Sequence, residues 1–148
     1  MEILQALPPK SAAAPDVQLL HAVLLTNRGD VAEAERVCQQ VLAGDELNAG
    51  AHYLKALCRE HAGDRLAAVE QDQIAIYLDP LFAMPHVHLG LLAKRAGDTE
   101  TARRELGQAG TLLAREDAAR ILLFGGGFNR EALMQLCRAE LRACGGSR

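Results

Sequence analysis

Small and apolar residues recur along this chain at a fixed interval of 34 residues. The clearest marker is a Gly-Asp pair that appears three times, beginning at Gly29, Gly63 and Gly97. An alanine follows each of these glycines by five residues, and a small residue precedes each by seven. These two columns are Ala34, Ala68 and Ala102, and Ala22, Ala56 and Gly90. A register shared by several columns indicates an internal repeat that occurs three times.

Each repeat predicts two antiparallel helices on either side of the Gly-Asp pair. Glycine ends the first helix because it adopts a left-handed conformation that a Cβ would penalise. Aspartate begins the second helix because its carboxylate accepts from the free N–H groups of the first turn. The expected helix pairs are 16–28 with 31–43, 49–62 with 65–78, and 83–96 with 99–113. Asn129 is then expected to cap a last helix at 130–144.

The period and the phased small residues match the tetratricopeptide repeat (TPR) pattern. This resemblance implies an all-α fold, a right-handed TPR superhelix of three helix-turn-helix repeats plus a C-terminal capping helix. The expected divisions are an N-terminal arm or linker at 1–15, repeats at about 16–48, 49–82 and 83–115, and a Gly-rich connection with the capping helix at 116–148. The apolar face of that helix is expected to consist of Leu133, Leu136, Cys137 and Leu141. No docking place is assigned to the apolar start of the arm, Ile3-Leu4-Leu7.

The TPR resemblance also predicts a partner surface, because the first helix of each TPR lines the concave face. The inward columns are all apolar, and they contain Leu19, Val23, Tyr53, Leu57, Val87 and Leu91. Polar residues follow at the rim, including Asn27, His61, Lys94 and Arg95. An apolar floor with a polar rim suits an amphipathic helix or an apolar peptide, so we expect a protein or peptide partner. The alternative is that the chain's own N-terminal arm or tail fills this groove. The Lys and Asn clamp of chaperone-tail binders is missing, which disfavours a co-chaperone role.

Composition narrows the function classes further. The chain has 148 residues, 16 basic and 19 acidic side chains and a net charge of −3, so nucleic acid is not an expected partner. No apolar run approaches the ~20 residues of a membrane span, and the N-terminus does not resemble a signal peptide. The four cysteines form no C-x-x-C pair, and we expect them to be reduced and buried in a cytoplasmic protein.

Neither a catalytic residue nor a cofactor or metal site is expected. The segment from Ile121 to Asn129 imitates the strand, glycine-rich loop and helix of a nucleotide or S-adenosylmethionine site. It lacks a G-K-[ST] motif and parallel strands to join, so a glycine hinge before the capping helix is favoured. Cys58 and His61 offer two metal ligands, fewer than the four of a usual zinc site. His52 and His86 share a repeat column, where packing is expected.

Three stretches resemble a particular subset of TPR proteins: 51–64, 75–80 with 85–92, and the tail 122–133 with 136–138. Together they are similar to the C-terminal TPR region of CheR-type chemoreceptor methyltransferases. That resemblance implies a regulatory or docking region of an S-adenosylmethionine-dependent protein-glutamate O-methyltransferase in bacterial chemosensory signalling. The partner would be a chemoreceptor, a signalling protein or the parent's own methyltransferase domain. Nothing in the chain matches that domain, so no catalytic residue is carried over and the chain itself is not expected to be an enzyme. The alternative is a stand-alone TPR adaptor of another multiprotein assembly.

Overall fold

The computed structural model describes residues 15–145, and every regular element among them is an α-helix. Ile3, Leu4 and Leu7 of the arm lie outside the described residues. The helices are α3 (Pro15–Arg28), α4 (Val31–Gly44), α5 (Ala49–His61), α6 (Arg65–Leu78), α7 (Met84–Arg95), α8 (Thr99–Leu113), α9 (Ala118–Phe124) and α10 (Arg130–Ala143). Apart from α9, each begins and ends within one residue of the expected bounds. No helix among the described residues is long and apolar enough to cross a membrane.

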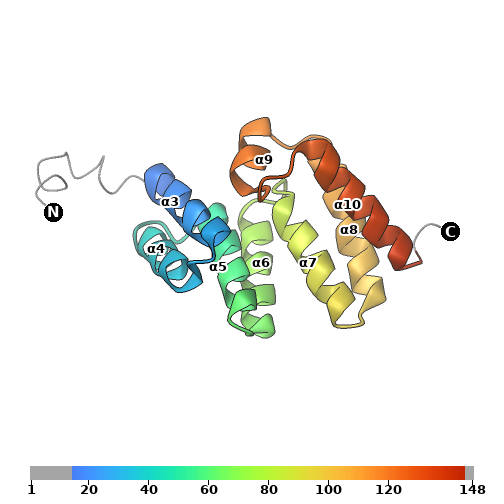
Figure 1. Cartoon of the computed structure of the whole chain (residues 1–148), viewed down its shortest axis with the longest axis horizontal. Helices are drawn as coiled ribbons and strands as arrows, with labels where there is room; N and C mark the ends of the chain where they lie inside the picture. The colour runs from blue at the N-terminus through green and yellow to red at the C-terminus, as the bar shows by residue number, and fades with distance from the viewer. Residues whose placement is uncertain (1–14, 146–148) are drawn as a thin grey trace, which may run out of the picture.

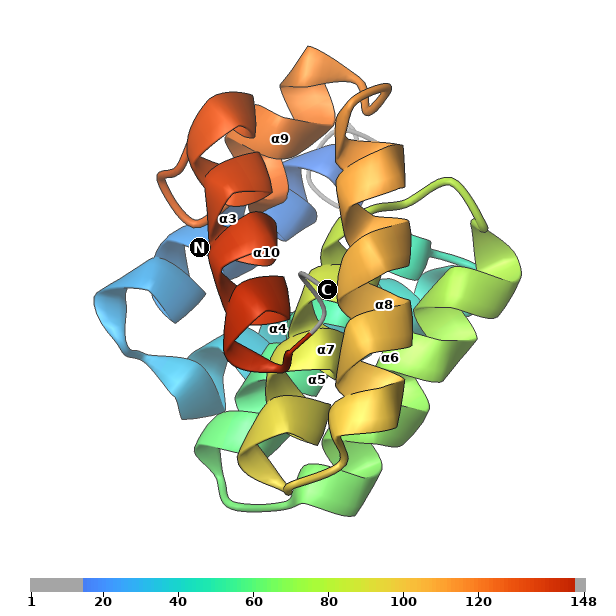
Figure 2. The same ribbon diagram turned by 90° about the vertical axis from the view of Figure 1, so that its right-hand side faces the viewer.

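The three helix pairs stack side by side along the long axis of the molecule, as the 34-residue repeat predicts (Figure 1). Each pair packs internally, and the second helix of one pair packs on the first helix of the next. Helix α10 then packs on α8 at the end of the stack (Figure 2). The all-helical TPR superhelix with a terminal helix is therefore confirmed.

The Gly-Asp pairs form the turn between the helices of each pair. Gly29, Gly63 and Gly97 have φ values of 89°, 86° and 84°, in the left-handed region where a side chain would be strained. Asp64 and Asp98 cap the following helices, because each carboxylate accepts a hydrogen bond from the backbone N–H three residues later, that of Ala67 or Thr101. The first pair departs from the prediction, because the Asp30 carboxylate accepts from Arg28 and does not cap α4.

The small residues of the repeat lie where helices cross. Ala34, Ala68 and Ala102 are fully buried, as are Ala22 and Ala56. In the third repeat the same column holds Gly90, where an added Cβ would lie 2.6 Å from Cγ of Leu106. Close helix packing therefore explains why these columns contain only alanine or glycine.

Helix α9 is absent from the sequence-based expectations, which assign its residues to a Gly-rich connection. Because Ile121 to Phe124 are helical, the strand-loop-helix layout of a nucleotide site is also absent. The hinge itself is present: Gly126 and Gly127 have φ values of 65° and 91°. A Cβ on Gly125 would lie 2.5 Å from the carbonyl oxygen of Ile121. Each of the three glycines is thus required by backbone geometry.

The capping helix buries a narrower face than the sequence predicts. Leu133 and Cys137 are buried in the core, whereas Leu136 and Leu141 are only partly buried. Arg130 in its first turn donates to the carbonyl oxygen of Leu113 at the end of α8. This bond satisfies one of the free carbonyl groups at the C-terminus of that helix.

Candidate functional site

A cavity of about 250 Å³ lies on the concave side of the repeats. Its floor consists of α3, α5 and α7, the first helices of the three pairs. Seven of the ten residues predicted for the partner surface line it: Val23, Asn27, Tyr53, Leu57, Val87, Leu91 and Arg95. The repeat pattern therefore brings these residues together, although their role in binding stays a prediction.

The other three predicted residues lie elsewhere. Leu19 lines a neighbouring cavity of about 390 Å³, between α3 and α9. Lys94 lines a third, of about 310 Å³, which shares Leu91 and Arg95 with the first and lies between α7 and α10. His61 is exposed at the C-terminal end of α5 and lines none of these three cavities.

The C-terminal tail forms one wall of the cavity without filling it. The wall residues, which the sequence analysis does not include in the site, are Leu123, Phe124, Gly125, Gly126, Phe128, Leu133 and Leu136. The tail therefore lines the groove, and a cavity remains between this wall and the floor.

Aromatic packing fixes α9 against the floor. The ring of Phe124 lies 5.9 Å from that of Tyr53 and 5.1 Å from that of Phe82, each in an edge-on arrangement. Such pairs contribute ~0.5–1.5 kcal/mol beyond the area that they bury. Gly50 makes room for Phe124, because a Cβ there would lie 2.6 Å from its ring.

Polar contacts hold the start of α9 as well. Arg120 pairs with Asp79 at 2.5 Å and with Glu116, and its guanidinium lies 4.3 Å from the centre of the Phe82 ring. The buried Glu116 carboxylate accepts from the backbone N–H of Ala83 at 2.9 Å. The wall is therefore attached firmly to the junction of the second and third repeats.

A buried ion network joins three helices beside the cavity. His88 of α7 bonds through Nδ1 to Asp72 of α6 at 2.5 Å and through Nε2 to Glu60 of α5 at 2.6 Å. The other oxygen of Glu60 accepts from Arg95 at 2.5 Å. Asp72 is 0% exposed and His88 is 5% exposed. Water therefore screens the pair little, and each charge depends on its partner.

The network shifts the pKa values of His88, Glu60 and Asp72. Burial alone would lower the pKa of His88, but its bonds to Asp72 and Glu60 outweigh burial and raise it to about 9. The hydrogen bond from His88 lowers the pKa of Glu60 to about 2. Burial raises the pKa of Asp72 to about 6, against the opposing effect of His88. At neutral pH the imidazolium of His88 thus lies between two carboxylates.

We expect the protein to lose stability as the pH rises from 6.5 to 9. The pKa of His88 rises from 6.5 in the unfolded chain to about 9 in the folded protein. Its ion pairs therefore stabilise the fold fully below pH 6.5, and this stabilisation is lost as the pH rises to about 9. Across this pH range the free energy of unfolding should fall by up to about 3 kcal/mol. Urea denaturation at both pH values measures it. A variant that lacks both His88 and Asp72 is the control, and an equal slope in that variant would assign the effect to other groups.

Two further histidines pack in matching positions of successive repeats. His52 bonds through Nδ1 to Gln71, and His86 bonds in the same way to Glu105, both at 2.7 Å. Both pairs therefore follow the 34-residue register, and the packing predicted for this column is confirmed. The sequence analysis did not include Asp72 and His88 in the site. The signal that could have identified them is that each is a charged or polar residue in a repeat column that is apolar in the neighbouring repeats.

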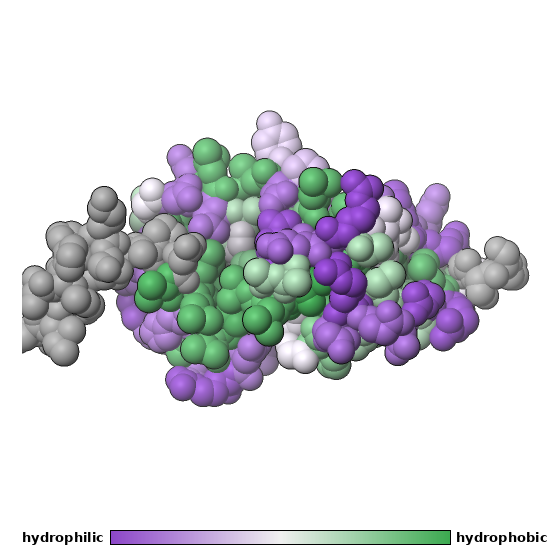
Figure 3. Space-filling model, turned by 90° about the horizontal axis from the view of Figure 1, so that it is seen from above, coloured by the Kyte–Doolittle hydropathy of each residue, from purple (hydrophilic) through white to green (hydrophobic). Residues whose placement is uncertain are grey.

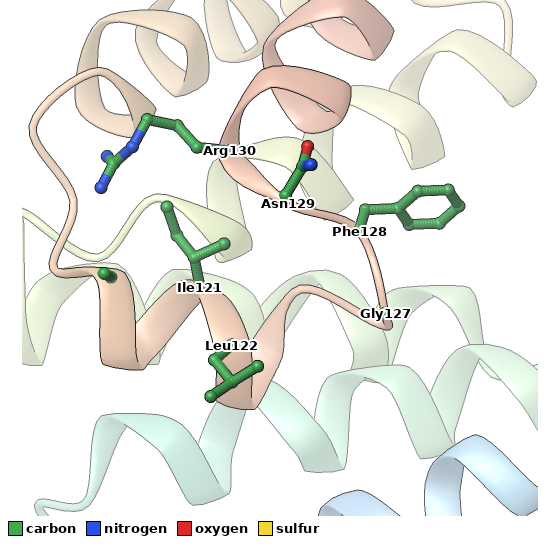
Figure 4. A pocket seen from close by; sticks show the side chains of 7 residues that line it. Ile121, Leu122, Gly127, Phe128, Asn129 and Arg130 are labelled. Atoms are coloured by element: carbon green, nitrogen blue, oxygen red, sulfur yellow. The ribbon is translucent and has the colours of Figure 1, made fainter.

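A separate cavity of about 300 Å³ lies at the hinge between α9 and α10. Ile121 points into the space between the two helices, and Leu122 and Phe128 also line the cavity (Figure 4). Leu122 is 84% exposed. This cavity is formed by the hinge itself and lies outside the repeat columns.

The candidate metal ligands are not assembled into a site. Among residues 15–145, no group of three or more His, Cys, Asp or Glu side chains is arranged to hold a metal ion. All four cysteines are free and buried. Burial raises the pKa of Cys38 to about 12 and that of Cys58 and Cys137 to about 11, so these thiols are poor nucleophiles at neutral pH.

Comparisons with known proteins identify the fold. No protein-family model matches the chain, and no curated protein matches its sequence. Among solved structures, it is similar to PcrH from Pseudomonas aeruginosa, with a TM-score of 0.73, 18% identity and coverage of 97% of this chain and 98% of that one. PcrH in complex with the chaperone binding region of PopD also scores 0.73, with 18% identity over 94% of each chain. SycD, the type III secretion translocator chaperone of Yersinia enterocolitica, scores 0.71 at 16% identity and covers 87% and 88%. At these identities the likeness establishes a TPR-type helical repeat fold.

Proposed function

We propose that this chain is a non-catalytic protein-interaction module that binds a peptide segment of its partner in the concave groove. The observation that carries this proposal is the groove itself, in which three successive helices present apolar side chains in register beside a cavity of about 250 Å³. Apolar grooves of this kind bind the apolar side of a peptide. The solved complexes of PcrH with a region of PopD and of SycD with a peptide of the translocator YopD support the same use of the fold here.

The groove also offers polar groups to a ligand. Among the residues that the structure describes, the Asn27 amide and the Tyr53 hydroxyl line the cavity without a hydrogen-bond partner of their own. Arg95 uses one N–H for Glu60 and has others available. These groups can form hydrogen bonds with the backbone N–H and C=O groups of an extended peptide, which need partners when they are buried.

A charged substitution in the floor tests the proposal. Leu57→Asp places a carboxylate in the apolar floor and should weaken binding of a partner peptide at least tenfold. Leu66→Asp is the matched control, because Leu66 is exposed on α6 and lines none of the cavities described above. The partner is first captured by full-length protein and reduced to its binding segment, whose affinity is then measured by calorimetry. Equal affinity for wild type and Leu57→Asp, with both chains folded, would contradict the groove as the binding site.

The finer hypothesis is that the module is the regulatory or docking region of a CheR-type methyltransferase. The tail stretch 122–133 favours it, because generic TPR proteins lack that pattern. The alternative, a stand-alone adaptor or chaperone, is supported by the solved neighbours, which match this chain over nearly their whole length. In either case the free, buried thiols fit a reducing, cytoplasmic environment.

Cytoplasmic fragments of chemoreceptors separate the two hypotheses. The receptor-linked function predicts that such fragments bind the wild-type chain and fail to bind Leu57→Asp. Binding of other cytoplasmic proteins, with no binding of receptor fragments, would instead support the stand-alone adaptor.

A further inference from the structure

The first helix of the stack has an apolar face that nothing in the described chain covers. Val17, Leu20 and Leu24 lie on one side of α3 and are 59%, 49% and 55% exposed. The opposite side of the same helix is buried in the core through Leu19, Ala22, Val23 and Leu25. A helix that is apolar on both sides is normally buried on both sides. Seen from above, hydrophobic side chains gather at the end of the molecule where the described chain begins (Figure 3).

The repeat register shows what this face is built to contact. Leu20 corresponds to Leu54 in the second repeat and to His88 in the third, and both of these are buried. Val17 and Leu24 likewise correspond to buried residues: Ala51 and Pro85, and Cys58 and Leu92. In those repeats the first helix packs on the second helix of the repeat before it, α5 on α4 and α7 on α6. Helix α3 therefore has the surface that receives a preceding second helix.

The start of the chain carries the matching pattern. In the same register, Ile3, Leu4 and Leu7 correspond to Val37, Cys38 and Val41, which are the buried face of α4. Gln5 corresponds to Gln39 and Gln73, which are both exposed. The chain length from Leu7 to the start of α3 also equals that from Val41 to the start of α5.

We propose that residues 1–7 dock on the exposed apolar face of α3, in the place that α4 takes on α5. Solenoids need such covering segments at their ends, and α10 has the same role at the other end.

The repeat register also predicts one specific side-chain contact. Leu4 and Leu20 occupy the positions of Asp72 and His88, whose side chains touch at 2.5 Å. In the full-length protein, Leu4→Cys combined with Leu20→Cys should therefore form a disulfide within one chain under mild oxidation. The native thiols are buried and should stay out of this reaction.

Peptide mapping by mass spectrometry identifies the linked cysteines, and non-reducing electrophoresis shows whether the disulfide lies within one chain or between two. The matched control is Gln5→Cys with Leu20→Cys, because Gln5 belongs to the exposed column and should cross-link at most a tenth as fast. A disulfide between two chains would overturn the proposal in favour of a second copy on this face. Absence of any cross-link, or equal rates for the two pairs, would also overturn it.

A stability measurement gives an independent reading. Leu4→Asp should lower the melting temperature of the full-length protein by about 3–6 °C, whereas Gln5→Asp should leave it unchanged. The shift should not depend on protein concentration, because docking within one chain does not. An unchanged melting temperature in Leu4→Asp, or a shift that appears only at high concentration, would contradict docking of the arm.

Discussion

Replacing His88 with leucine should lower the free energy of unfolding at pH 7 by about 3–5 kcal/mol. The substitution leaves the Asp72 carboxylate fully buried without its cationic partner, and its Oδ1 already lacks a hydrogen-bond partner among the described residues. Glu60 loses one of its two cationic partners and keeps Arg95. Urea denaturation followed by circular dichroism measures the change.

The neighbouring repeat supplies the compensating variant. Leu54 and Cys38 occupy the positions of His88 and Asp72 one repeat earlier, so His88→Leu combined with Asp72→Cys reproduces a pair that the fold already contains. Replacing a buried ion pair with apolar residues of similar size is often neutral or stabilising, so the double variant should recover to within about 1 kcal/mol of wild type.

A control separates this network from an ordinary histidine contact. His52→Leu removes hydrogen bonds to two neutral groups, the Gln71 amide and the Glu46 backbone carbonyl, at a half-buried site, and should cost only about 1–2 kcal/mol. If His88→Leu were no more destabilising than His52→Leu, the buried charge would not be what makes the network important.

Truncation after Phe124 should produce a chain that aggregates or melts more than 10 °C lower. Helix α10 covers α8, and its loss would expose the buried face of that helix to water. Burial of one leucine side chain contributes ~1.5–3 kcal/mol, and total domain stability is only ~5–15 kcal/mol. Differential scanning calorimetry and light scattering measure the two outcomes.

Point substitutions on α10 show which residues are responsible. Leu133 is 2% exposed, so Leu133→Asp buries a charge and should destabilise by about 3–5 kcal/mol. Leu136 is partly buried and lines the groove, so Leu136→Asp should affect stability less and peptide binding more. Gln135→Asp on the exposed side should change neither. A truncated chain that stays monomeric with an unchanged melting temperature would show that α10 is not a cap.

The helices and turns were predictable because their causes are local or periodic. Glycine at Gly29, Gly63 and Gly97 is required by a positive φ, and that requirement depends on only a few neighbouring residues. The floor of the groove was predictable for the same reason, since a repeat places residues of one column on one face. His61 shows the limit of that rule, because it lies past the last groove-facing turn of α5 and points to solvent.

The sequence by itself thus determined the repeat, the helix bounds, the crossing points and most of the groove floor. Only the tertiary structure decided that residues 118–124 are a helix and that Phe124 completes the groove wall, because its partners Tyr53 and Phe82 are distant in the chain. It also decided that His88 pairs with Asp72 and Glu60, since three separate helices must pack before these charges meet. Local propensity sets the elements, whereas burial of non-repeating residues against one another sets the wall and the ion network.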